Sequence, residues 1–424
     1  MKRPILTLVA CTFWLIVVGS TCGPTTKAPS VPDICGPVSG IVDAPLSFRV
    51  VSTDEAGDTV AYMVDWGDTS QPEWTPFAQS GESVSVAHTY GDSGDYLIKS
   101  KAKNGRALES SWSAEQTIQI AGRGALYPDS ILGEIPITGR SFSGAITPDD
   151  QYLYVLMSNT SSVLPLRLAD RTALPAIDVG QAIGDLDRIS IDPRCERAYV
   201  TMQSARCVKV IRLSDGIVVD SIALQENMGD LGVTQDGTHL CVTSSSTQMT
   251  YVVRTSDCSL VDSLNTGDFP SRLAFDPSGQ YVVISHPHKV AVLRQSDWSL
   301  VSEVPSDCTT GEIAVAEDGT ALYVAFPQDS AVGMVSTDNW SLGGRAYIGN
   351  NGLGTLVAGA HGQLLLVLDH QGIRYVDCRT NTVAGTLLYP RYPGEGHGLV
   401  SNHVGRELYL LGDFRIYVIG VRSQ

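Results

Sequence analysis

The feature of this sequence that most restricts its fold is a unit of about 42 residues that recurs from residue 130 to residue 424. One copy contains DFPSRLAFDPSGQYVVIS, which runs from Asp268 to Ser285. The turn of this copy, DPSG, ends at Gly279, and the strand residue four positions later is Val283. Successive copies place these residues there: Tyr154, Tyr199, Cys241, Val283, Tyr323, Leu366 and Tyr409. A period of this length indicates one supersecondary unit that is repeated side by side.

A complete copy contains four short apolar segments separated by turns. In the quoted copy they are RLAF at 272–275, QYVVIS at 280–285, KVAVLR at 289–294 and LVSEV at 300–304. No 3.6-residue periodicity persists along the chain, which argues against helical repeats. Four antiparallel strands in each of seven copies predict an all-β fold, a seven-bladed β-propeller at residues 130–424.

The last copy has only three strand segments, and its missing fourth segment is found at the start of the repeats. The segment SILGEIPITG, Ser130 to Gly139, matches the fourth-strand segment SLVDSLNTG, Ser259 to Gly267. We therefore expect the ring to close by pairing of its N- and C-terminal strands. Such pairing removes two sheet edges that would otherwise be exposed.

The sequence motifs of the repeats resemble those of the YVTN-type, or lactonase-like, propellers. Ala198-Tyr-Val-Thr201 and Leu322-Tyr-Val-Ala325 carry the likeness, although the Asn that usually follows is missing. The resemblance is therefore to the superfamily. It implies either a binding propeller of the cell envelope or an enzyme of the lactonase-like or quinoprotein-like kind. The chain contains no GxSxG nucleophile motif.

Residues 35–121 alternate apolar and polar residues in short bursts, which predicts a small antiparallel sandwich. Tyr62-Met-Val-Asp-Trp-Gly-Asp68, His88-Thr-Tyr90 and Gly94-Asp-Tyr96 resemble the PKD domain, an immunoglobulin-like module. The resemblance implies a spacer or adhesion role. Asp65 and Asp68 allow two interpretations, turn carboxylates that cap backbone amides or oxygen ligands of calcium.

The first 22 residues have the order of an export signal. Lys2 and Arg3 precede an apolar run and the small residues Gly19 and Ser20, and Cys22 follows. A cysteine in this place resembles the lipobox of bacterial lipoproteins, which would make Cys22 the lipidated residue. The alternative is cleavage near Ser20 without a lipid. Residues 23–34 and 122–129 read as linkers, so we expect an exported protein anchored by lipid on the cell surface or in the periplasm.

Charge and cysteine content exclude some functions. The formal net charge of -16 repels phosphate backbones, so nucleic acid is not expected as a partner. The cysteines after the signal are odd in number, and they leave disulfide connectivity open. They are Cys35, Cys195, Cys207, Cys241, Cys258, Cys308 and Cys378. No CxxC pair occurs, which argues against a structural zinc site.

The main candidate site is the position that enters the first strand of each repeat. Aligned copies place there Ser143, Arg188, Asp230, Arg272, Glu312, Thr355 and Gly398. The four charged members alternate in sign. One interpretation is a ring of ion pairs that lets neighbouring blades abut. The other is a polar pocket at the channel mouth, in which Arg188 and Arg272 hold a carboxylate or a phosphate.

Turn residues supply secondary candidates. His286, His288 and His370 fall between second and third strands, and Glu395 and His397 lie in a long junction. Together they suit a metal site or a general base, whereas exposed histidines without a function are the alternative. The corner residues Trp298 and Trp340 are expected to pack between blades.

Two hypotheses for function follow. The first is a monomeric binding or scaffold module of the cell envelope, with a protein, peptide or glycan partner and no cofactor apart from the calcium considered above. The second is a propeller enzyme whose site lies at the mouth of the channel. An enzyme should have a deep axial pocket in which Arg188, Asp230, Arg272 and Glu312 converge with a metal or a histidine. If these four residues pair only with each other and the channel is plugged, the enzyme hypothesis fails.

Overall fold

The computed structural model describes most of the chain beyond the predicted signal. The described residues are 27–42, 45–121, 126–158, 160–316, 319, 321–349, 353–358, 364–369, 372–377, 382–388, 396–403 and 407–423. Cys22, His370, Cys378 and Glu395 lie outside them. Within these ranges the chain is all-β apart from two short 3-10 turns, at Gln203–Ala205 and Pro327–Asp329. No helix among these residues is long and apolar enough to cross a membrane.

Residues 27–121 form two sheets that pack on each other, which we call the N-terminal sandwich. One sheet has the order β1-β3-β5 and the other β2-β7-β6-β4. Their bounds are β1 Asp33–Cys35, β2 Ser39–Ile41, β3 Pro45–Val51, β4 Val60–Asp65, β5 Val84–Thr89, β6 Gly94–Asn104 and β7 Gln116–Ala121. The shared core includes Phe48, Tyr62, Tyr90, Ile98 and Ile118, and Trp66 and Tyr96 pack against it.

Residues 126–423, the repeat region, contain five four-stranded antiparallel sheets whose strands are in sequence order. The first two comprise β13 Ile189–Ile191, β14 Arg197–Met202, β15 Cys207–Arg212, β16 Ile217–Ala223, β17 Met228–Val233, β18 His239–Ser244, β19 Met249–Arg254 and β20 Leu260–Asn265. The next two comprise β21 Leu273–Phe275, β22 Tyr281–His286, β23 Lys289–Arg294, β24 Leu300–Pro305, β25 Ile313–Val315, β26 Ala321–Phe326, β27 Ala331–Ser336 and β28 Ser341–Tyr347. The fifth comprises β29 Leu353–Ala358, β30 Leu364–Asp369, β31 Gly372–Asp377 and β32 Thr382–Leu388. The repeated four-stranded unit predicted from the period is confirmed.

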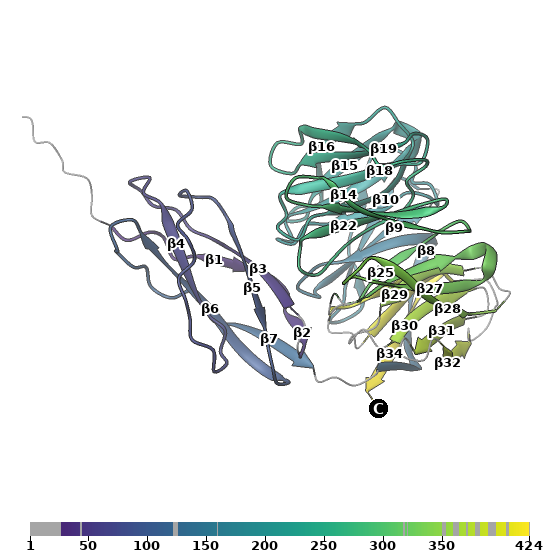
Figure 1. The fold of residues 1–424 in the computed structure, drawn as a ribbon, viewed down its shortest axis with the longest axis horizontal. Helices are drawn as coiled ribbons and strands as arrows, with labels where there is room; N and C mark the ends of the chain where they lie inside the picture. The colour runs from purple at the N-terminus through teal and green to yellow at the C-terminus, as the bar shows by residue number, and fades with distance from the viewer. Residues whose placement is uncertain are drawn as a thin grey trace, which may run out of the picture.

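The two ends of the repeat region meet in a sixth sheet, of order β11-β10-β9-β8-β34-β33, in which β12 also pairs with β10. Its strands are β8 Leu126–Ile146, β9 Tyr152–Ser158, β10 Ser162–Arg167, β11 Thr172–Ala173, β12 Ile177–Asp178, β33 Gly396–Ser401 and β34 Glu407–Ser423. Antiparallel β8 and β34 place Ile135 opposite Ile416. Figure 1 shows β34 and β8 beside each other although they lie far apart in the sequence.

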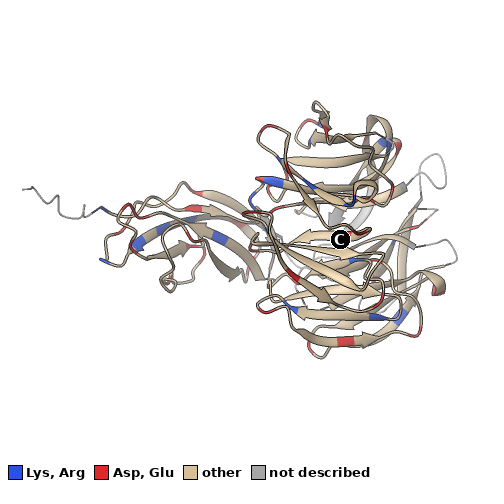
Figure 2. Ribbon diagram, turned by 90° about the horizontal axis from the view of Figure 1, so that it is seen from above, with Lys and Arg blue, Asp and Glu red and all other residues tan. Residues whose placement is uncertain are grey.

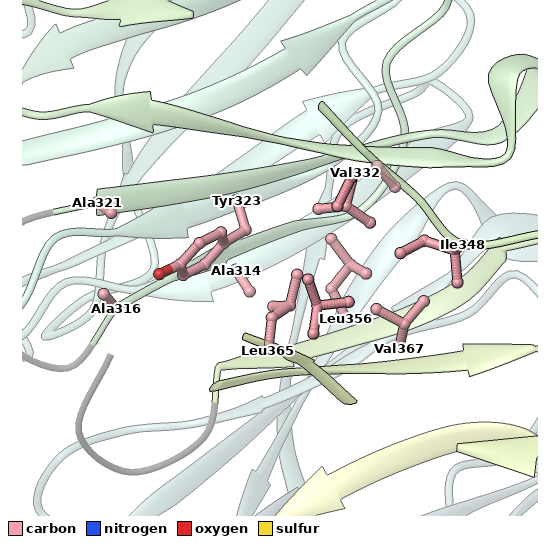
Figure 3. Close-up of a cluster of buried hydrophobic side chains, with 12 residues drawn as sticks. Ala314, Ala316, Ala321, Tyr323, Val332, Ile348, Leu356, Leu365 and Val367 are labelled. Carbon is pink, nitrogen blue, oxygen red and sulfur yellow. The ribbon is translucent and has the colours of Figure 1, made fainter. Parts of the chain in front are cut away.

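Neighbouring sheets bury apolar faces against each other. Figure 3 shows one such layer, in which Tyr323 and Val332 of one sheet face Leu356, Leu365 and Val367 of the next. The removal of apolar surface from water is the main driving force for folding. Each sheet therefore depends on its neighbours, as a stacked repeat requires.

The turn between the first and second strands of a repeat requires a left-handed residue at its end. Gly279 supplies it with φ 70°, which costs glycine little. Cys195 and Asp150 hold the equivalent positions with φ of 57° and 53°. A side chain in this conformation costs about 1 kcal/mol, so these two residues are strained where glycine would not be.

The corner tryptophans pack across neighbouring sheets. Trp340 meets Tyr281 of the preceding sheet edge-on, with ring centroids 5.2 Å apart and planes at 77°. Trp298 meets His239 in the same way at 5.5 Å. The expected packing between repeats is therefore present.

Replacement of Trp340 by Ala is expected to lower the free energy of unfolding by about 2 kcal/mol, because it removes an aromatic pair and part of the buried surface between two sheets. Denaturant unfolding of the full chain measures the loss. Trp112→Ala is the control, since Trp112 is exposed. Equal losses in the two variants would contradict a packing role for Trp340.

Candidate functional site

The residues that enter the first strand of each repeat converge on one cavity of about 610 Å³. Its wall includes every member of the aligned position: Ser143, Arg188, Asp230, Arg272, Glu312, Thr355 and Gly398. Asp185, Phe142 and His397 line it too. Its volume lies within the ordinary range of small-molecule sites, roughly 300 to 1,000 Å³. Among the residues that the structure describes, Lys and Arg are interspersed with Asp and Glu (Figure 2).

Arg272 and Glu312 form an ion pair between neighbouring sheets. Arg272 Nε donates to Glu312 Oε1 at 2.5 Å, and the two side chains are only 22% and 27% exposed. Burial alone would lower the pKa of Arg272, but Glu312 and Asp230 raise it above its ordinary value. This half of the charged ring matches the ion-pair interpretation.

Arg188 has a different set of partners. Its Nη1 atom donates to the backbone carbonyls of Asp185 at 3.3 Å and Asp187 at 3.1 Å. Within the described part of the chain it forms no ion pair. Burial, and then the charge of Arg272, lower its pKa. A guanidinium has five N–H donors, so Arg188 retains donors for a ligand in the cavity.

Asp230 stabilises backbone rather than an arginine. Its carboxylate accepts from the amide of Leu273 at 3.2 Å and from that of Leu231 at 2.9 Å. Burial raises its pKa, while Arg272 and Arg188 act in the opposite direction. Asp230 therefore anchors the beginning of β21 and contributes a negative charge to the cavity. The alternating ring thus contains one ion pair and two differently bonded charges.

His397 lies on the same wall and is held by an acidic partner. Its Nε2 atom is 2.8 Å from Asp413 Oδ1, which also accepts from Arg140 Nε at 2.8 Å. The imidazole stacks on Phe142 with a centroid distance of 4.2 Å. Although burial opposes it, the hydrogen bonds from Arg140 and His397 lower the pKa of Asp413. A fixed imidazole at a cavity wall is suited to hydrogen bonding or proton transfer.

The other histidines do not join this cluster. His286 was expected on an exposed turn, but it is 1% exposed, and burial lowers its pKa. Its Nδ1 atom contacts the Asp268 carbonyl at 3.1 Å. His288 is exposed at the turn between β22 and β23. Over the described ranges, no group of three or more His, Cys, Asp or Glu residues is arranged to hold a metal ion.

Asp65 and Asp68 lie at the end of β4 and in the turn after it. Asp65 Oδ1 accepts from the Gly67 amide at 3.1 Å. Asp68 accepts from the Ser70 amide at 3.0 Å and lies 2.7 Å from His88 Nε2. These contacts fit the turn interpretation of both carboxylates, and calcium binding stays a prediction.

Arg140, Asp185 and Asp413 were missed by the sequence analysis. Asp413 stands in the turn between the last two predicted strands, and Arg140 lies just after the segment 130–139 that was matched to a fourth strand. The predicted pairing of these segments was therefore the one signal that could have brought Arg140 and Asp413 together.

No family model matches the chain, and no curated protein matches it. The fold and the cavity define an all-β protein of repeated four-stranded sheets with a polar, charged pocket. The resemblances to YVTN-type propellers and to PKD domains rest on the quoted motifs.

Proposed function

We propose that the repeat region is a seven-bladed β-propeller and that the cavity opens at one end of its axis. The five sequential sheets supply five blades, and the sheet that contains β8 and β34 supplies the first and the last. This proposal is supported by the residues that enter the first strand of each repeat, because all of them line one cavity. Residues drawn from all seven repeats converge in this way in a closed ring.

The function that this geometry supports best is ligand binding by an exported protein of the cell envelope. Cys22 would anchor the chain through a lipid, and residues 35–121 would act as a PKD-like spacer. The ligand would be a peptide that presents a carboxylate to Arg188. The observation that carries this proposal is the partly buried guanidinium of Arg188, which lines the cavity and, among the described residues, donates to the backbone carbonyls of Asp185 and Asp187 without an ion-pair partner. Charge-assisted bonds to a carboxylate are the strong contacts that such a group makes.

The test is calorimetric titration of the full chain with trialanine and with its C-terminal amide. Trialanine should bind, and its amide should bind at least about 10-fold more weakly, because the amide lacks the anionic partner. Arg188→Gln should weaken binding of trialanine by about 10 to 100-fold. Arg294→Gln is the matched control, because Arg294 pairs with Asp297 at an exposed corner.

Two outcomes would count against the peptide. If galacturonic acid binds through Arg188 and trialanine does not, the partner is a glycan. If Arg188→Gln and Arg294→Gln bind both probes equally well, the cavity is not the binding site.

The four charged positions line one cavity with His397, which is the arrangement expected of an enzyme. The pair of His397 and Asp413 therefore favours a second function, that of a lactonase-like enzyme. The imidazole of His397 would act as the general base for attack of water on a lactone carbonyl. Hydrolysis of a panel of small lactones, lost in His397→Gln and retained in His288→Gln, would support it.

A further inference from the structure

Two cysteines from different parts of the chain lie where the N-terminal sandwich meets the repeat region. Cys35 ends β1 and pairs in register with Arg49 of β3. Cys195 ends the turn that precedes β14 and has the left-handed conformation described above. Both are free thiols in this structure, and both are partly buried.

Arg49 shows that these two parts of the chain are in contact. A Cβ atom built on Gly237 would lie 2.8 Å from Arg49 Nη1 and 3.4 Å from Pro193 Cδ. Arg49 is only 5% exposed. The strand that pairs with Cys35 therefore contacts the turn at Gly237, and this turn lies beside the turn of Pro193 that ends at Cys195. In Figure 1, β3 lies on the side of the sandwich that faces the repeats.

The electrostatics of the thiols agree with this contact. Burial, then Asp33, raise the pKa of Cys35 to about 11, and the charges of Arg194 and Glu196 also act on this thiol. These two residues flank Cys195 in the sequence. Burial and Asp149 raise the pKa of Cys195 to about 12, and Cys35 is among the groups that act on it. Cys35 therefore lies among charged residues that flank Cys195, in agreement with the contact that Arg49 makes.

We propose that Cys35 and Cys195 form a disulfide bond that locks the N-terminal sandwich onto the turns of the repeat region. Cys195 occupies a position that Gly237, Gly279 and Gly319 fill in other repeats with the same left-handed φ. A strained residue where glycine would be relaxed points to a role for its side chain. This proposal rests on the proposed export of the protein, because a disulfide bond persists in an oxidising compartment. It does not depend on the proposed binding of a ligand.

The bond forms by thiol–disulfide exchange with a disulfide oxidant of the exporting compartment. One cysteine attacks the disulfide of the oxidant and releases its first thiol, and the other cysteine then displaces the second. The two sulfurs of the protein are oxidised, and the disulfide of the oxidant is reduced to two thiols that carry the two protons. Because both thiols are largely protonated at neutral pH, the exchange in the folded protein is slow without a catalyst.

The experiment oxidises the full chain with glutathione disulfide, blocks remaining thiols with N-ethylmaleimide and maps the peptides by mass spectrometry. We expect a peptide that links Cys35 to Cys195 and the loss of two alkylated sites, both reversed by dithiothreitol. Cys35→Ser and Cys195→Gly should each abolish this peptide. Glycine relaxes the turn at position 195, so loss of the link in that variant does not come from misfolding.

Cys258→Ser is the matched control, because Cys258 is also partly buried and left-handed, and it should retain the linked peptide. Full alkylation of Cys35 and Cys195 after oxidation would overturn the proposal, as would a link from Cys195 to another cysteine. If the link forms with glutathione disulfide but is missing from protein isolated from cells, the pairing stands and the proposed export is wrong. Failure of the peptide titration does not bear on this result.

Discussion

Replacement of Glu312 by Gln is expected to lower the free energy of unfolding by about 3 kcal/mol, because it leaves the largely buried Arg272 guanidinium without its anionic partner. Arg272 is 22% exposed, and its Nε atom donates to Glu312 at 2.5 Å. The remaining nearby carboxylate, Asp230, already accepts hydrogen bonds from two backbone amides. Urea unfolding of the full chain, followed by circular dichroism, measures the loss.

The matched control is Glu303→Gln, which removes a carboxylate that is 47% exposed and paired with Lys289. Exposed ion pairs contribute about 0 to 1 kcal/mol, so this variant should unfold almost as the parent does. The double variant Arg272→Met, Glu312→Leu should recover most of the stability, because it removes both members of the ion pair and leaves neither without its partner. If Glu312→Gln is no more destabilised than Glu303→Gln, Glu312 does not compensate a buried charge.

The repeated sheets could be predicted because each strand segment has its own local signal. The Asp-Pro-Ser-Gly turn of the quoted repeat ends at Gly279 with the left-handed φ that such a turn needs. The apolar run 289–294 is β23. Pattern and turn chemistry act over a few residues, so they can be read without knowledge of the tertiary structure.

The bonding of the charged ring could not be predicted from the alternation of its charges. Arg272 reaches Glu312, whereas Arg188 has no ion-pair partner in the described residues, and Asp230 bonds to the Leu273 amide. Side-chain reach and backbone placement decide between these outcomes. The cluster of His397, Asp413 and Arg140 was even harder to predict from the sequence, because Arg140 and Asp413 are 273 residues apart.

The contact between the N-terminal sandwich and the repeats could not be predicted from the sequence either. Arg49 and Cys35 read as ordinary strand residues, and Cys195 reads as an ordinary turn residue. The contact of Arg49 in β3 with the turn at Gly237, which lies beside Pro193, brings these parts of the chain together. An interface between parts of a chain leaves little periodic signal, because a few scattered residues make it.

Replacement of Ile416 by Asp is expected to lower the free energy of unfolding by at least about 4 kcal/mol, because a carboxylate would be buried without a partner. Ile416 is 0% exposed and lies opposite Ile135, which is 3% exposed. Both belong to one apolar cluster with Leu153 and Leu411. Leu132→Asp is the control, since Leu132 lies in β8 at 48% exposure and should lose little.

The same variant separates a closed ring from an open array. In a ring each sheet has two neighbours, so weakening the β8 and β34 pair should lower the stability of every sheet in one transition. In an open array the energy is a sum over neighbouring units, and damage at the end frays only that end. Amide hydrogen exchange at Tyr281–His286 distinguishes these outcomes, because β22 lies far from the terminal strands in sequence. Faster exchange there in Ile416→Asp supports closure, and unchanged protection at β22 beside open terminal strands would show that the seven-bladed ring is wrong.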